Sequence, residues 1–332
     1  MDHRTTRPGP RLIEHAGPWA LGYFRRPGGS AFSGLVQHDR VLDLSCRDEV
    51  GRPASPASLF DAWDAVLPLL EQLAQVTDAW EQLAGLEVLS PVEPRQIFQA
   101  GANYRSHVLD LVVAHHDGAD GRTAEQVRAD AAAHMDDRLA MPPFVFQGLP
   151  SAICGAFDDV VIPHGAEQPD WELELAVVIG RRARRVPAEK ALEYVAGWTI
   201  ANDVTLREKV FRKDSPGLGA DWLGSKNQPT FLPVGPVVVP YGSVPNPGDL
   251  RVTLQLNGSV MQDASTAELI FDVPRLVAYC SDVATLLPGD LLLTGSPAGN
   301  GLAHGRLLRA GDVMHSTISG LGAQSNRCVD ET

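Results

Sequence analysis

The segment 171–180 reads as a buried strand that carries two acidic side chains. Successive side chains of a strand point to opposite faces, so Glu172 and Glu174 share one face and the apolar residues around them share the other. Two like charges side by side repel, and they repel more strongly when they are partly buried. The two glutamates could therefore lie on a solvated strand face, or a bound divalent cation could neutralise them. The apolar surroundings favour the cation, and carboxylates suit Mg²⁺, Mn²⁺ and Ca²⁺.

The composition is that of a globular protein and argues against two classes of partner. The chain has 332 residues, of which 44% are hydrophobic and 21% charged, enough for one large domain or a large domain plus a small one. Its net charge of −13 disfavours binding to nucleic acid or to anionic membranes, because phosphate contacts need a basic surface.

The cysteines and the N-terminus predict a cytoplasmic location. The four cysteines are widely spaced and form no C-x-x-C pair, which favours free thiols in a reducing compartment. Residues 1–8 lack the apolar core of a signal peptide, and no segment is long and apolar enough to cross a membrane.

Two regions are predicted, a small N-terminal domain over residues 1–90 and a larger domain over 91–332. In the first we expect short strands near 19–24, 34–37 and 40–44, a helix ending near 73 and a second helix over 78–83. In the second, the polar segment 108–141 has a helical composition and is predicted to be an inserted lid.

The larger domain has a mostly β pattern with few helices, which predicts an α+β fold rather than a βαβ repeat. From residue 142 onward, helical patterns are scarce and occur near 187–195, 205–213 and 273–284. Apolar runs punctuated by Pro and Gly recur at 144–146, 175–179, 198–201, 234–239, 252–256, 269–271, 291–294 and 313–318.

A third carboxylate and a histidine could complete a site. Asp203 ends the apolar run 198–201, where it could be a third metal ligand or the N-cap of a following helix. If a helix starts near 104, His107 and Asp110 are neighbours on one of its faces. A carboxylate beside an imidazole makes a general base, although surface His–Asp pairs are also common.

Further polar residues could bind a substrate. Lys226 lies in a loop framed by Trp, Gly and Pro, and Arg207 follows Asp203 by one helical turn. Arg207 could hold a substrate carboxylate or be an ordinary solvated residue. The Gly/Ser turn that contains Ser296 could receive a developing oxyanion or be a purely structural turn.

Over about residues 95–322 the chain resembles the fumarylacetoacetate hydrolase superfamily. The resemblance is carried by the order and spacing of Gly101-Ala102-Asn103-Tyr104-Arg105-Ser106-His107, the strand 170–180, Ala201-Asn202-Asp203-Val204, Asn257-Gly258 and the segment 287–299. It implies a mixed β-sheet roll, a homodimer and a divalent-metal site, with Mg²⁺ expected and Mn²⁺ or Ca²⁺ as alternatives.

The resemblance also implies roles for individual residues. The metal ligands would be Glu172, Glu174 and Asp203; the catalytic residues His107 as base, Asp110 as its partner and Lys226; and the substrate contacts Tyr104, Arg207, Thr294, Gly295 and Ser296. Many members carry a lysine in the block that matches 143–151, where this chain has none, and Gln147 is expected to fill part of that space.

The expected activity is hydrolysis of a carbon–carbon bond in a 2,4-dioxo acid of the acylpyruvate type, with a water activated by His107. Decarboxylation of a β-keto acid such as oxaloacetate, and hydration or isomerisation of a 2-oxo-enoate, are alternatives that use the same chemistry. The non-enzyme alternative is a catalytically inactive scaffold that binds a small acid.

Overall fold

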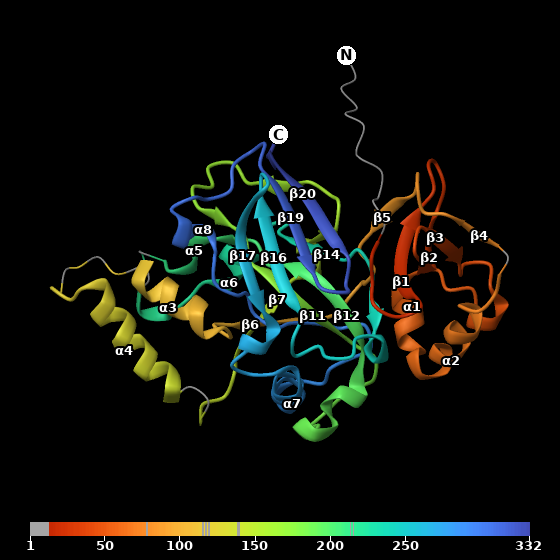
Figure 1. The fold of residues 1–332 in the computed structure, drawn as a ribbon, viewed down its shortest axis with the longest axis horizontal. Helices are drawn as coiled ribbons and strands as arrows, with labels where there is room; N and C mark the ends of the chain where they lie inside the picture. Colours follow the sequence, from red (N-terminus) through yellow and green to blue (C-terminus); the bar gives the residue numbers. More distant parts are fainter. Residues whose placement is uncertain are drawn as a thin grey trace, which may run out of the picture.

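The computed structural model describes residues 13–332 apart from positions 78, 115, 117, 119, 138, 139, 213 and 215 (Figure 1). The interpretation of residues 1–8 therefore lies outside the described residues. In the described part of the chain, no helix is both long and apolar enough to span a bilayer.

The N-terminal region forms a five-stranded sheet of its own, in the order β4-β3-β2-β1-β5. Two helices, α1 (Pro56–Asp61) and α2 (Trp63–Leu73), follow its third strand. The strands are β1 (Ala20–Arg25), β2 (Ala31–Gln37), β3 (Arg40–Asp43), β4 (Trp80–Gln82) and β5 (Glu87–Leu89). The boundary at residue 90 stays a prediction.

The helix predicted over 78–83 is wrong. Residues 80–82 form β4, which pairs with β3 so that Val41 lies opposite Glu81. Pairing with a distant strand has overridden the local helical preference. Asp78 itself lies outside the described residues.

A mixed sheet of eight strands forms the centre of the larger region, in the order β7-β6-β18-β11-β12-β14-β8 with β15 also paired to β12. Its strands are β6 (Ile97–Gly101), β7 (Phe144–Gly148), β8 (Ile153–Gly155), β11 (Leu173–Ile179), β12 (Val195–Asn202), β14 (Leu232–Val234), β15 (Val239–Pro240) and β18 (Leu291–Leu293). All seven residues of β11 are buried, which explains its continuous apolar run.

A second sheet, in the order β17-β16-β19-β20-β9, contributes to the same apolar core as the odd-numbered residues of β11. Its strands are β9 (Val160–Ile162), β16 (Arg251–Leu256), β17 (Ser259–Ser265), β19 (Val313–Ile318) and β20 (Ala323–Asp330). On the other face of β11, Ala176 and Val178 share a core cluster with residues of α1 and α2. A Cβ on Gly180 would meet Trp63 at 2.7 Å, so α2 packs at the far end of β11 from the acidic residues.

The remaining helices lie around these sheets. The segment 108–141 falls on α3 (Arg105–Ala114) and α4 (Ala124–Asp137), which project from the side of the molecule opposite the N-terminal sheet (Figure 1). The helix predicted over 273–284 is confirmed as α7 (Val273–Val283). The helix predicted over 205–213 is mostly wrong. Its first residues form β13 (Thr205–Leu206), which pairs with β10 (Pro169–Asp170), and only a single helical turn, α5 (Arg207–Val210), follows. Two short helices complete the set, α6 (Trp222–Lys226) and α8 (Gly301–His304). The predicted fold class, mixed sheets with few helices, is confirmed.

Candidate metal centre

Three buried carboxylates meet where β11 begins and β12 ends. The strands are antiparallel, with Leu173 opposite Asn202, so the end of one strand lies beside the start of the other. Glu172, Glu174 and Asp203 each offer an oxygen, and these oxygens lie within 4.8 Å of one another. The N-cap alternative for Asp203 is wrong, because α5 begins only at residue 207 and its N-cap position is residue 206.

Neighbouring groups hold the three carboxylates in place. The Gln99 amide donates to Asp203 Oδ1 at 2.6 Å, and the Gly295 N–H donates to Glu174 Oε2 at 2.6 Å. The Thr205 hydroxyl donates to Glu172 Oε1 at 3.2 Å. Such contacts orient metal ligands and restrict their rotamers.

Two cations lie against the cluster. Lys226 Nζ is 2.6 Å from Asp203 Oδ2 and 3.2 Å from Glu172 Oε2. Arg207 bridges the carboxylates of Glu172 and Asp170, with contacts of 2.7 and 2.8 Å. When ionised, these four buried carboxylates therefore exceed the two neighbouring cations by two negative charges. A divalent ion with oxygen ligands would balance that excess, so the donor set fits Mg²⁺ or Mn²⁺.

The excess charge also appears in the pKa values of the ligands. Burial raises the pKa of Asp203 to about 6, although Lys226 partly opposes this. Burial and the charge of Asp203 raise the pKa of Glu174 well above its usual range. Burial acts in the same direction on Glu172, but Lys226 and Arg207 outweigh it and lower its pKa to about 2.

Metal affinity is expected to fall as the pH decreases through 6. Asp203 has a raised pKa of about 6, so below that pH a proton competes with the cation for its carboxylate. Titration calorimetry with Mn²⁺ at a series of pH values measures this directly. An affinity that stays constant through that range would contradict the prediction.

His107, near the start of α3, is buried and lines the same small cavity as the three carboxylates. Burial lowers its pKa to about 4, only partly opposed by the nearby charge of Glu172. It is therefore neutral at pH 7 and able to accept a proton. Among the described residues no hydrogen bond joins it to Asp110, whose carboxylate instead binds Arg128 Nη1 at 2.7 Å. The proposed His–Asp pair is thus not formed in this structure.

The cavity has a volume of about 110 Å³ and an aromatic wall that the sequence did not predict. Phe146 stacks on Trp222 with ring centroids 4.5 Å apart, and Phe144 lies 5.9 Å from the same indole. In the β6–β7 pair, Phe146 lies opposite Gln99, so both are on the face that carries the site. Gln147 is exposed on the other face, so this geometry gives no support to its predicted substrate contact.

The other predicted residues divide into two groups. Arg207, Lys226 and Ser296 line the cavity with His107. Thr294 and Gly295 are not among the residues that line it: the Thr294 hydroxyl donates to the Leu175 carbonyl, and the Gly295 N–H donates to Glu174.

Among the described residues, two buried donor groups near the site have no hydrogen-bond partner. They are the hydroxyl of Tyr104, which is completely buried, and Nη2 of Arg207. An unsatisfied buried donor is costly unless a ligand or water meets it.

Replacement of Lys226 by methionine is expected to lower the free energy of unfolding of the metal-free protein by about 3–5 kcal/mol. The change leaves Asp203 and Glu172 without the ammonium group that they share. Saturating Mn²⁺ should then raise the melting temperature more in the variant than in the unaltered protein, because the ion restores the lost positive charge. Lys190→Met, at an exposed site, is the control. Equal metal-free stability of the two variants would contradict this account.

The chain is similar to known proteins over most of its length. Residues 96–329 match the model of the fumarylacetoacetate hydrolase C-terminal domain. The chain is 30% identical to the mitochondrial oxaloacetate tautomerase fahd2 of Xenopus laevis, over 89% of this chain and 84% of that protein.

Two solved structures share the fold. A 5-carboxymethyl-2-hydroxymuconate delta-isomerase from Mycobacterium smegmatis has a TM-score of 0.67 and 27% identity, covering 94% of this chain and 99% of that one. A maleylpyruvate hydrolase from Sphingobium, solved with manganese(II) and pyruvate, has a TM-score of 0.70 and 26% identity, covering 94% and 100%. The family match covers most of the chain, and the protein belongs to the fumarylacetoacetate hydrolase family.

Proposed function

We propose that this protein is a divalent-metal-dependent enzyme that moves a proton at the carbon beside the keto group of a small 2-oxo acid, with oxaloacetate as the model substrate. The observation that carries the proposal is a buried, neutral His107 in the same cavity as three carboxylates suited to one Mg²⁺ or Mn²⁺. The similarity to an oxaloacetate tautomerase supports this reaction.

The residues of the cavity have distinct tasks in this reaction. The unpaired Nη2 of Arg207 is a donor for a substrate carboxylate, and Phe146 and Trp222 exclude water from one side. His107 takes the proton from the carbon beside the keto group and delivers it to the keto oxygen, which gives the enol. Ketonisation is the same transfer in reverse. Glu172, Glu174 and Asp203 would hold the ion, which when bound supplies the Lewis acidity that makes this carbon–hydrogen bond acidic.

Oxaloacetate and Mn²⁺ provide the test of this activity. Ketonisation of freshly dissolved enol-oxaloacetate is followed by the loss of enol absorbance, with the enzyme present or absent and with or without a chelator. We expect a rate that depends on enzyme and metal, with no release of pyruvate. The absence of any metal-dependent change in the rate would refute the proposal.

Hydrolysis of an acylpyruvate is the second candidate. It is favoured by Lys226 and Ser296, whose polar groups line the cavity where a tetrahedral oxyanion would need donors, and by the likeness to a maleylpyruvate hydrolase. Water activation would be strengthened if Asp110 left Arg128 and reached His107. Release of pyruvate from acylpyruvates, but not from oxaloacetate, would favour this candidate; release from oxaloacetate would favour decarboxylation. An inactive scaffold would release pyruvate from neither substrate.

A homodimer is part of this proposal. Three large apolar side chains of the segment 211–223 are strongly exposed: Phe211 by 62%, Leu218 by 86% and Leu223 by 67%. Several exposed apolar groups in one short segment are typical of a contact surface. Light scattering should therefore give twice the chain mass of 35.7 kDa, and Leu223→Asp should shift the mass toward the monomer. A monomeric unaltered protein would contradict the assignment.

A further inference from the structure

Three aromatic side chains, Phe144, Phe146 and Trp222, form an aromatic wall on one side of the cavity at the carboxylate cluster. Phe146 stacks on Trp222 with ring centroids 4.5 Å apart and an angle of 14° between the rings. Phe144 lies 5.9 Å from Trp222 and 6.2 Å from Phe146, so each ring packs against the other two. The Lys226 Nζ atom is 5.9 Å from the centre of the Phe146 ring. The aromatic wall therefore lies directly beside the proposed metal centre.

Small residues at the end of β6 complete the apolar part of the cavity. Gly101 lies opposite Phe144 in the β6–β7 pair, and a Cβ added at this glycine would meet the Phe144 ring at 2.8 Å. Ala100 and Ala102 also line the cavity, and their side chains are single methyl groups. The only polar atom in the side chains of these three residues and of the aromatic wall is the indole nitrogen of Trp222. This part of the cavity therefore suits an apolar group.

Among the described residues that line the cavity, no cation is left to pair with a second carboxylate of a substrate. Lys226 is paired with Asp203 and Glu172. Arg207 is paired with Glu172 and Asp170. With a divalent ion, these two cations balance the four ionised buried carboxylates, and the carboxylate at the 2-oxo end of a substrate then adds one negative charge near Nη2 of Arg207. A second carboxylate would lie beside the aromatic wall, where burial of an unpaired charge is costly and the negative ring faces repel it.

We infer that the site selects 2-oxo acids whose second arm, the group on the carbon beside the keto group, is apolar and is best filled by a flat ring. The inference rests on the proposed function, which places the 2-oxo end at the ion and Arg207. In that reaction one proton moves between this carbon and the keto oxygen, and the arm keeps all of its bonds. Phe144 is 45% exposed, so the aromatic wall reaches the surface and a ring can extend along it beyond the cavity volume of about 110 Å³. Oxaloacetate, whose arm is a carboxylate, is then a substrate but not the preferred one.

Oxaloacetate and 4-methyl-2-oxopentanoate are matched probes, because they have the same number of non-hydrogen atoms and a forked arm, and only the arm of oxaloacetate is charged. Titration calorimetry on the full chain with saturating Mg²⁺ should show the apolar acid binding at least about tenfold more tightly than oxaloacetate. Phenylpyruvate, which carries a ring, should bind at least as tightly as the apolar acid. Equal or tighter binding of oxaloacetate would overturn the inference.

Turnover of the same acids tests the proposed function separately. It is followed by NMR as the exchange, in D₂O, of the hydrogens on the carbon beside the keto group. Tighter binding of the apolar acid, without metal-dependent exchange in any of the acids, would refute the proposed function and support the selectivity. Metal-dependent exchange in oxaloacetate, together with tighter binding of oxaloacetate, would support the proposed function and refute the selectivity.

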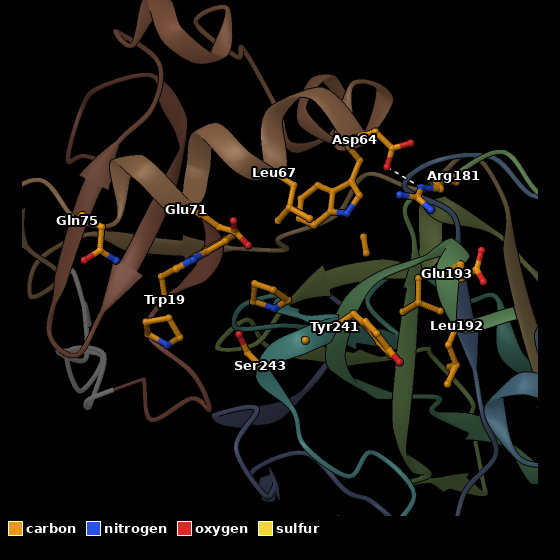
Figure 2. Close-up of a pocket in the computed structure, with 16 residues that line it drawn as sticks. Trp19, Asp64, Leu67, Glu71, Gln75, Arg181, Leu192, Glu193, Tyr241 and Ser243 are labelled. Carbon is orange, nitrogen blue, oxygen red and sulfur yellow. Dashed lines mark hydrogen bonds and ion pairs between the residues drawn. The ribbon is translucent and has the colours of Figure 1, made fainter. Parts of the chain in front are cut away.

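Phe144→Lys places a cation at the exposed end of the aromatic wall, and it should shift the ratio of the two affinities toward oxaloacetate by at least about threefold. Leu149→Lys is the control, because Leu149 is 43% exposed, follows the same strand and does not line the cavity. Leu67→Gln changes the larger hollow of about 640 Å³ between α2 and the eight-stranded sheet (Figure 2) and should leave both affinities unchanged. Circular dichroism confirms folding of each variant. An unchanged ratio in the Phe144 variant, or weaker binding of the apolar acid in the Leu67 variant, would overturn the assignment.

Discussion

His107→Asn is expected to lower the turnover number by about two to four orders of magnitude, the usual contribution of a general base. This imidazole is the base in our proposal, because it is neutral, buried and lines the cavity with the three carboxylates. Asparagine keeps a polar side chain of moderate size but has no basic nitrogen. The measurement is the turnover number on the best substrate with saturating Mn²⁺.

Two controls separate loss of the base from loss of the site. Mn²⁺ affinity of the variant should stay within about threefold of the unaltered protein, because His107 is not a proposed metal ligand. His134→Asn changes an exposed histidine on α4 and should leave turnover unchanged. Full turnover in the His107 variant would place the base elsewhere.

Glu174→Gln is expected to weaken Mn²⁺ binding by at least about 100-fold, since even residues that only support metal ligands contribute about 10–100-fold. An amide keeps the shape of the side chain and can still accept the Gly295 N–H, but it has no charge. In the metal-free protein the same change should not lower stability, because burial and Asp203 already disfavour the ionised form.

These two results together are specific to a metal ligand. A residue that only stabilised the fold would lower the melting temperature of the metal-free protein when changed. Glu189→Gln, at an exposed position, should alter neither quantity. A Glu174 variant that binds Mn²⁺ normally would exclude this carboxylate from the centre.

Local sequence singled out the three carboxylates as candidates, and the family resemblance joined them into one predicted metal site. Alternation along a strand places Glu172 and Glu174 on one face, and the next apolar run ends at Asp203. The supporting Gln99 was missed because it comes from β6, 104 residues before its partner Asp203. Alternation along β7 separates Phe146 from Gln147, but only the packing of the sheet decides which of them faces the cavity.

The His107–Asp110 pair shows the limit of spacing arguments. Helical spacing does bring the two side chains to one face of α3, as the sequence predicted. The structure then adds Arg128 from α4, a helix whose packing against α3 local sequence does not reveal, and this arginine binds Asp110. The helix predicted over 78–83 failed for a similar reason, since pairing with β3 decided the conformation.

The central claim is that Glu172, Glu174 and Asp203 together bind one divalent ion. A crystal grown with Mn²⁺ and measured at the manganese absorption edge tests it most directly. We predict one anomalous peak per chain, at about 2.0–2.3 Å from an oxygen of each carboxylate, with Lys226 displaced from at least one of its two contacts. A cluster without a peak, in which Lys226 still joins Asp203 to Glu172, would contradict the account.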